Sequence, residues 1–185
     1  TPPLSDSQKL KNTTMEALEA LLTRRSIRAY EDRMPAQELI DKVMEAGLYA
    51  ASGKNMQTAI IVEVTNKEVR KRLSVINAEI MGTTADPFYG APVVLAVLAD
   101  KSSPNHVCDG ALMMGNLMNA ARAVGLGSCW INRARETFDR ADGRRMLEEW
   151  GIEGDYEGIG FCVLGFPAKE GKAAPRKAGR VFYVK

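Results

Sequence analysis

The chain has 185 residues, 45% of them hydrophobic and 26% charged, and its formal net charge is +2. This length suits one domain with a sizeable core, and the near-neutral charge argues against a general nucleic-acid binder, which usually carries a strongly basic face. Since no apolar run reaches the ~18 residues of a membrane span, we expect neither nucleic acid nor a membrane as a partner.

The cysteine and histidine content argues against disulfide, metal and hydrolytic chemistry. Cys108, Cys129 and Cys162 form no Cys-x-x-Cys pair, so neither a disulfide framework nor a zinc site is indicated. A reducing compartment is the simplest interpretation, and we expect a cytoplasmic protein. Cys129 is a conceivable nucleophile, but a free cysteine is more often a small core residue. The single histidine, His106, lies in a polar turn and cannot by itself build the usual metal site.

The N-terminal part divides into an arm and a first helix. Residues 1–13 are polar and contain proline, which predicts a flexible arm, and residues 14–185 are expected to form a single domain. A helix is predicted at 15–25, where Thr13 or Thr14 can cap its start. On this interpretation the arginines lie in the last turn, where cations favour the helix dipole.

Helices and strands alternate in the middle of the chain. The predicted elements are a helix from Pro35 to Tyr49, a turn-rich loop at 50–57, a strand at 58–65, a short helix at 67–76, a Gly/Pro/Thr-rich connection at 81–90 and a strand at 91–100. The last strand is apolar almost throughout, which indicates a central strand buried on both faces. The connection at 81–90 is the best candidate for a mobile lid.

The second half begins with a helix that has little polar surface. The predicted elements are a helix from Asp109 to Val124, a segment at 125–131 in which Gly125 ends that helix, a helix at 140–152, a strand at 158–167, a basic stretch at 174–180 and a short strand at 181–185. A helix that is apolar nearly all round is buried in a core or at an interface. The sequence therefore predicts one α+β or mixed α/β layer structure with a buried helix.

Two basic clusters are candidates for an anion site. One holds Arg24, Arg25 and Arg28 around Ser26, and the other holds Arg176, Lys177 and Arg180. Taken singly, each is better explained as a solvated helix end or a solvated tail. Taken together, two dense basic sites in a nearly neutral chain could converge on one phosphate, whose oxygens suit the planar fork of arginine.

Six stretches follow one another in an order that is specific as a set, although each is weak alone. They are LLTRRSIRAYEDRMP, GLYAASGKNMQ, DPFYGAPVVLAVLAD, DGALMMGNLMNAARAVGLGSCWI, IGFCVLGFP and APRKAG. Through them the chain resembles the FMN-dependent nitroreductase family over nearly its whole length after Thr14. The resemblance implies an α+β fold with a central, mostly antiparallel mixed sheet flanked by helices. It also implies an obligate homodimer with C-terminal strand exchange and FMN at the subunit interface.

The resemblance also implies which residues contact FMN. The phosphate and ribityl chain would be held by Arg24, Arg25 and Ser26, and from the basic tail by Arg176 and Lys177. Arg28 would reach the pyrimidine side of the flavin, where a cation favours the negatively charged reduced ring.

Two further segments would contact the flavin. The partner subunit would supply a loop with Ala51, Ser52, Gly53, Asn55 and Gln57, and backbone contacts near flavin N5 would come from Ser128, Cys129, Trp130, Ile131 and Asn132. The loop departs from the family pattern, because Ala51 replaces the usual proline and Gln57-Thr58-Ala59 replaces a Gln-Pro-Trp-like ending. Phe88 and Tyr89 would form a substrate wall, or alternatively pack at the base of the following strand.

The expected function is reduction of electron-poor molecules such as nitroaromatics or quinones, with NAD(P)H as electron donor, by a ping-pong hydride mechanism. The flavin performs the difficult step, so no side chain is assigned a certain catalytic role. The alternatives are a non-catalytic flavin-binding protein for storage or regulation, and a protein of the same fold without flavin.

Overall fold

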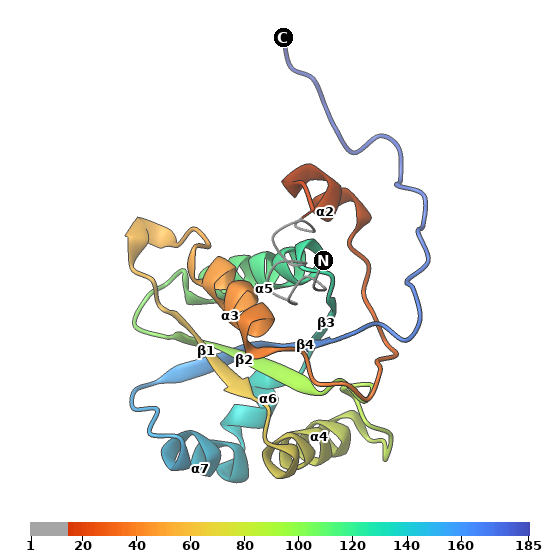
Figure 1. The fold of residues 1–185 in the computed structure, drawn as a ribbon. Helices are drawn as coiled ribbons and strands as arrows, with labels where there is room; N and C mark the ends of the chain where they lie inside the picture. The colour runs from red at the N-terminus through yellow and green to blue at the C-terminus, as the bar shows by residue number, and fades with distance from the viewer. Residues whose placement is uncertain (1–14) are drawn as a thin grey trace, which may run out of the picture.

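A four-stranded antiparallel sheet forms the centre of the computed structural model, which describes residues 15–185 (Figure 1). The strands are β1 (Ala59–Val64), β2 (Val93–Asp100), β3 (Gly127–Ile131) and β4 (Tyr156–Gly165), in the spatial order β1-β2-β4-β3. Every neighbouring pair is antiparallel. The parallel element of the expected mixed sheet is a single bridge between Ser26 and Ser128.

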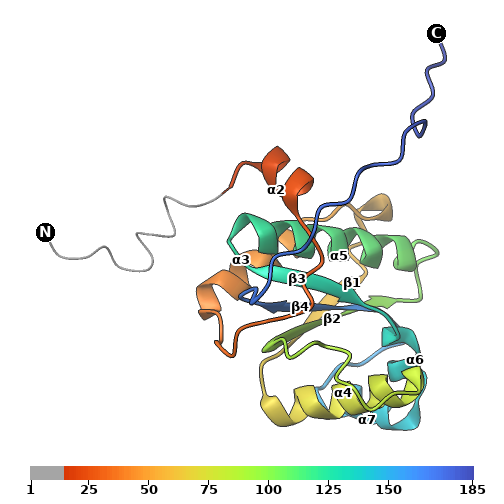
Figure 2. The ribbon, with the colours of Figure 1, turned by 90° about the vertical axis from the view of Figure 1, so that its right-hand side faces the viewer.

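Helices cover both faces of this sheet (Figures 1 and 2). One face carries α3 (Gln37–Leu48) and α5 (His106–Ala123), and the other carries α4 (Lys67–Met81), α6 (Ala134–Asp139) and α7 (Ala141–Glu149). Helix α2 (Ala17–Thr23) packs against α5, and the 3-10 turn η1 (Gly53–Asn55) lies between α3 and β1. The expected α+β class is confirmed.

Strand β2 is buried on both faces, as its apolar sequence predicts. Val93, Leu95 and Val97 pack towards α3 and α5, and the residues between them pack towards the helices of the other layer. Side chains alternate in direction along a strand, so this single strand contributes to both cores. Burial of each such aliphatic side chain stabilises the fold by about 1.5–3 kcal/mol.

The end of α5 also confirms a sequence prediction, whereas its start differs. Gly125 has φ +82° and donates its N–H to the carbonyl oxygen of Arg122, and Leu126 donates to that of Ala121. This is the Schellman arrangement that a glycine after a helix indicates. The helix starts earlier than expected, because His106 is its first residue and is bonded to Glu157 and Ser103 rather than solvated.

Other element boundaries differ from the sequence prediction. Helix α4 is longer, because its Asn66 cap is followed by 15 helical residues before Gly82 turns the chain with φ +73°. Helix α6 is additional, since the polar stretch 134–139 gave no clear signal. Helix α2 is shorter, so Arg24 and Arg25 follow it instead of lying in its last turn. The caps proposed at 13 and 14 and the arm at 1–13 lie outside the described residues.

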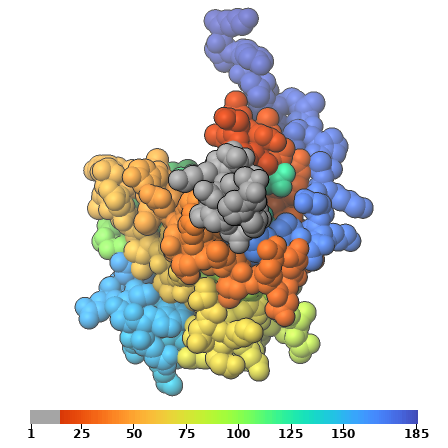
Figure 3. All heavy atoms as spheres, viewed as in Figure 1, coloured from red at the N-terminus to blue at the C-terminus, as the bar shows by residue number. Residues whose placement is uncertain are grey.

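The C-terminal segment leaves the body of the molecule. Residues 166–185 contain no helix or strand, which contradicts the strand expected at 181–185 within a single chain. The segment runs past α2 and projects beyond it (Figures 1, 2 and 3). Its apolar end, from Val181 to Val184, is at least 69% exposed.

Candidate functional site

The arginine-rich segment after α2 is held against β3 and the end of β4. The N–H of Ile27 donates to the carbonyl oxygen of Ser128 at 2.9 Å, and the N–H of Glu31 donates to that of Phe166 at 2.9 Å. Ile27 is buried, and alternate side chains of an extended chain face opposite ways. Its neighbours Ser26 and Arg28 therefore remain more accessible than Ile27, and Arg28 is exposed.

The three arginines of this segment have different environments. Arg25 donates from Nη1 to the carbonyl oxygens of Leu22 and Arg24, at 2.9 and 2.7 Å, and so helps to end α2. The Nη1 atom of Arg24 is buried and has no hydrogen-bond partner among the described residues. An unpaired buried donor costs about 1–3 kcal/mol, so an anionic oxygen placed beside Arg24 would remove this cost. The donor set therefore fits a phosphate group.

A small hollow beside Arg24 gathers further polar groups. Arg122, from the last turn of α5, lines it and donates from Nε to Thr23 Oγ1 at 3.1 Å. Ser128 and Glu170 also line it. The sequence analysis did not single out Arg122, because a basic residue in the last turn of a helix is ordinary.

A second pocket, of about 300 Å³, brings together residues from distant parts of the sequence. It is lined by Arg28, Tyr89, Cys129, Trp130, Ile131 and Asn132, with Asp86 and Arg133 among the other lining residues. All of the first six were expected on sequence grounds to contact the flavin or the substrate. Cys129 is only 3% exposed, so its thiol is not available to a ligand. Contact with the flavin would come from its backbone, as expected. Burial and nearby Cys129 raise the pKa of Cys162 on the neighbouring strand.

Phe88 does not line this pocket, which contradicts its expected contact with substrate. Its side chain is 0% exposed, and its ring packs 5.3 Å from the ring of Phe161, centroid to centroid. Phe88 instead packs at the base of β2, which was the alternative expectation for this residue. Tyr89, the next residue, has φ +54°, is 40% exposed and lines the pocket.

The connection at 81–90 is fixed around Asp86, contrary to the expectation of a mobile lid. The Asp86 carboxylate accepts hydrogen bonds from Arg70 at 2.6 Å, from Ser74 at 2.7 Å, and from the N–H groups of Phe88 and Gly90. Burial alone would raise the pKa of Asp86, but these hydrogen bonds outweigh it and lower the pKa below 3.8. One ionised carboxylate thus holds the wall of the pocket.

The loop predicted to act in trans has a strained backbone. Lys54, Asn55 and Gln57 have φ of +52°, +53° and +52°, a left-handed conformation that non-glycine residues rarely adopt. The N–H of Gln57 donates to Ser52 Oγ at 3.1 Å, and its side-chain amide donates to Asn55 Oδ1 at 3.2 Å. Strain of this kind persists where the surroundings fix it, often at functional sites.

Asp109 fixes this loop, and the sequence analysis missed it. Its buried carboxylate accepts the N–H of Gly53 at 2.9 Å and the hydroxyl of Thr58 at 3.1 Å. A side chain at Gly53 would press against the amide of the Asn105 side chain, which would have to shift to make room. The available signal was an aspartate in the first turn of a helix with little other polar surface.

A single chain does not bring all the expected cofactor residues together. The loop at 51–57 and the segment at 24–28 lie on opposite sides of the molecule in Figure 1. Arg176 and Lys177 are exposed, and Arg176 donates only to the carbonyl oxygen of Ala174 among the described residues. The chain passes close to the arginines five residues earlier, since a side chain at Gly171 would lie 2.5 Å from Arg25 Cβ.

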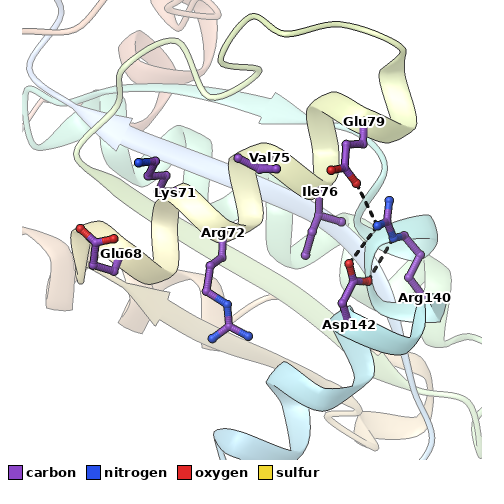
Figure 4. Close-up of a pocket in the computed structure, with 8 residues that line it drawn as sticks. All are labelled: Glu68, Lys71, Arg72, Val75, Ile76, Glu79, Arg140 and Asp142. Carbon is purple, nitrogen blue, oxygen red and sulfur yellow. Dashed lines mark hydrogen bonds and ion pairs between the residues drawn. The ribbon is translucent and has the colours of Figure 1, made fainter.

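A larger groove, of about 440 Å³, lies elsewhere, between α4 and α7 (Figure 4). Arg140 crosses it and pairs with Glu79 at 2.9 Å and with Asp142 at 2.8 Å. Such exposed ion pairs contribute about 0–1 kcal/mol each. None of the expected cofactor residues lines this groove, so it is a surface feature of the helical layer.

Residues 15–185 offer neither a metal site nor a membrane span. No cluster of histidine, cysteine or acidic side chains suited to a metal ion occurs there. None of the helices formed by these residues combines the length and apolar character that crossing a bilayer requires.

Comparison with known proteins places this geometry in a family. The Nitroreductase family model matches residues 21–84 and 77–166. A candidate NADH dehydrogenase/NAD(P)H nitroreductase of Methanothermobacter thermautotrophicus is 30% identical over 168 residues, covering 86% of this chain and 81% of its own length. An FMN reductase [NAD(P)H] of Bacillus subtilis is 26% identical over 178 residues, covering 87% and 70%.

Solved structures give the same result. A nitroreductase from Bacteroides fragilis, solved with bound FMN, superposes with a TM-score of 0.85 at 27% identity, covering 93% of this chain and 100% of that one. The chain belongs to the nitroreductase family.

Proposed function

We propose that the protein is an NAD(P)H-dependent oxidoreductase that binds FMN and reduces electron-poor small molecules such as nitroaromatics or quinones. The observation that carries the proposal is the buried Nη1 of Arg24, which has no hydrogen-bond partner in the described part of the chain. It lies on the segment that also carries Arg28 into the ring pocket. A phosphate group at one end and a flavin ring at the other would use both features of this segment.

The names of the relatives support the chemistry. They include an FMN reductase [NAD(P)H] of Bacillus subtilis and an NADPH-flavin oxidoreductase of Vibrio harveyi. The nitroreductase of Bacteroides fragilis contains FMN. When bound, FMN supplies hydride transfer from NAD(P)H to an acceptor, in two half-reactions that we expect to be ping-pong.

The chain's own residues would bind and orient the reactants. Arg24, Arg25 and Ser26 would hold the phosphate and ribityl end, and Arg28 would place positive charge beside the ring. The backbone of Ser128–Asn132 would fix the ring from the strand side. Tyr89 lies in the turn that the Asp86 carboxylate holds through its hydrogen bonds. Its side chain would limit access of water and substrate from the opposite wall of the pocket.

We further propose that the cofactor site is completed by a second copy of the chain. The loop around Asn55 lies far from the arginines of its own chain, and large apolar side chains surround it. Leu48, Tyr49, Met56 and Leu112 are at least 50% exposed. Contact with a partner at this face would cover them and bring the loop to the partner's arginines, with Arg176 and Lys177 reaching the phosphate.

We make two further proposals, on the extent of the domain and on the location of the protein in the cell. We propose that residues 14–185 act as one FMN-binding domain. We also propose a cytoplasmic location, which the three free thiols of Cys108, Cys129 and Cys162 support.

One anaerobic experiment separates this function from flavin storage. The purified protein is loaded with FMN, and its visible absorbance is followed while NADH or NADPH is added, and then a nitroaromatic. The proposal predicts bleaching by at least one donor and recovery on addition of the acceptor. Bound FMN that neither donor bleaches would favour the non-catalytic alternative, and protein that takes up no FMN would contradict both.

A further inference from the structure

Arg133 lies at the edge of the ring pocket in a conformation that its surroundings enforce. It follows β3 with φ +73°, a left-handed backbone that non-glycine residues rarely adopt. Its Nε atom donates to Asn77 Oδ1 at 2.9 Å. Asn77 in turn donates from Nδ2 to the carbonyl oxygen of Asn132 at 2.9 Å and is 0% exposed. One buried amide therefore fixes both the backbone and the side chain of this turn.

The remaining donors of Arg133 are free. Its two terminal nitrogens form no hydrogen bond or ion pair with the described residues, and Arg133 lines the pocket. An arginine that only contacts solvent needs no buried partner, because its own flexibility lets water solvate it. A guanidinium held through Nε presents its terminal pair in a fixed direction, as bidentate binding of a carboxylate or phosphate requires.

The charges around the pocket favour an anion. The ionisable groups that line it are Arg28, Asp86, Tyr89, Cys129 and Arg133. The carboxylate of Asp86 is already neutralised by Arg70 and bonded to Ser74. Arg28 and Arg133 are therefore left without a counter-charge from residues 15–185, and Arg28 alone would serve the flavin ring.

We infer that Arg133, positioned by Asn77, binds an anionic oxygen group of the molecule that enters the ring pocket. The inference rests on the proposed function, and it narrows the substrate to one carrying a carboxylate or phosphate group. The group could belong to the acceptor or could be the adenosine 2′-phosphate of NADPH, which NADH lacks.

The test compares two pairs of ligands whose members differ by one anionic group, the carboxylate of 4-nitrobenzoate in the first pair and the 2′-phosphate of NADPH in the second. Binding of 4-nitrobenzoate and of 4-nitrobenzyl alcohol to the FMN-loaded protein is measured by calorimetry without reductant. Binding of NADPH and of NADH is measured after anaerobic exchange of FMN for a flavin analogue that cannot be reduced. The variant is Arg133→Gln. The control is Arg145→Gln, an exposed arginine of α7 that does not line the pocket.

Arg133→Gln should weaken binding of the member that carries the extra anionic group, in one of the two pairs, by at least about tenfold, the loss expected for a charge-assisted bond. Binding of the member without that group should change less than about twofold. A loss for 4-nitrobenzoate identifies an acceptor carboxylate, and a loss for NADPH identifies the donor phosphate. Arg145→Gln should change neither pair. Equal effects within both pairs, or loss of FMN from the variant, would overturn the inference.

The proposed function can fail separately from this inference. Because binding is measured without turnover, a protein that discriminates 4-nitrobenzoate through Arg133 but is not reduced by NAD(P)H would retain the anion site and lose the proposed activity. Arg133→Lys adds a further check, since a lysine keeps the charge but not the fork. Full retention of anion binding by Arg133→Lys would contradict a fixed bidentate contact.

Discussion

Neighbouring arginines in this chain have separate tasks that the sequence does not distinguish. Arg25 is used within the chain, because it bonds the carbonyl oxygens of Leu22 and Arg24. Arg24 has a buried donor that finds no partner among residues 15–185. The difference comes from the end of α2 at Thr23, which turns one side chain back to the helix and the other into the hollow beside β3.

Arg24→Ala should therefore weaken FMN binding by about 1.5–3 kcal/mol, the value of a hydrogen bond to a charged group. Titration of apoprotein with FMN, followed by quenching of flavin fluorescence, measures this change. Arg145→Ala on the outer helical layer serves as the matched control and should leave the affinity unchanged. An Arg24→Ala protein with unaltered affinity would mean that this arginine belongs to a solvated helix end.

Arg28→Ala should act on the electronic state of the flavin more than on its affinity. Loss of a positive charge beside the reduced, anionic ring should lower its two-electron reduction potential by about 30 mV, which corresponds to about a tenfold change in the equilibrium. Spectroelectrochemistry with a reference dye measures the potential. A potential equal to that of the unmodified protein would show that Arg28 does not sense the charge of the ring.

At the scale of single residues, the sequence motifs predicted the residues that line the pocket. They gave no sign of the buried side chains that hold the neighbouring loops and turns in place. Arg28, Tyr89 and Asn132 meet at one pocket, as expected from the order of the motifs. Asp109 and Asn77 are buried. The hydrogen-bond partners of the Asp109 side chain lie at least 51 residues away in the sequence, and those of the Asn77 side chain lie at least 55 residues away. Partners so distant in the chain leave no local pattern, so only the fold reveals them.

At the scale of elements, the turn between α4 and β2 depends on a single carboxylate. Asp86 receives bonds from Arg70 and Ser74 of α4 and from two N–H groups of its own turn, and these bonds lower its pKa. A group whose pKa is lower in the folded state stabilises the protein above the unfolded-state value and loses this effect as the pH falls through the folded value.

Asp86→Asn should therefore reduce the free energy of unfolding by about 1–2 kcal/mol near neutral pH, since the site is partly exposed to solvent. The difference between variant and parent should shrink as the pH is lowered below 3.8, the ordinary pKa of the carboxyl. Urea unfolding at a series of pH values tests both points. A difference that does not depend on pH would assign the loss to packing instead of charge.

Element types followed from the sequence more closely than element ends. The β2 strand and the Gly125 turn were predictable because burial on both faces and a left-handed turn each demand particular residue types. Helix α6 and the last turns of α4 were not, because their polar sequences form helices only where tertiary packing supports them. Phe88 shows the same limit, since an aromatic residue before a buried strand suits a core and a substrate wall equally well.

At the scale of the whole molecule, the distance between the arginine segment and the loop at 51–57 is the main consequence of the fold. Helices α3 and α5 lie between them in Figure 1. Gly53 is tied to Asp109 at the start of α5, and Ile27 is tied to β3 beyond its end. Neither segment can move to the other without breaking buried hydrogen bonds, so a site that uses both requires two copies of the chain.

Exchange of the C-terminal segment would explain why the tail leaves its own chain. Val181, Phe182, Tyr183 and Val184 are 69–99% exposed, and four adjacent apolar or aromatic side chains so exposed favour contact with another surface. Removal of residues 181–185 should weaken the dimer, which sedimentation at decreasing protein concentration would detect. An unchanged dissociation constant would mean that these residues take no part in subunit contact.

The shared site is tested most directly with mixed dimers. One copy carries Arg24→Ala, the other carries Asn55→Ala together with Gln57→Ala, and two affinity tags select dimers that contain both. In a twofold-symmetric dimer, one of the two sites then has both unmodified segments and the other has both defects. The account predicts about one tightly bound FMN per mixed dimer, although each parent variant binds FMN weakly. Mixed dimers that bind FMN no better than either parent would contradict a site built from two chains.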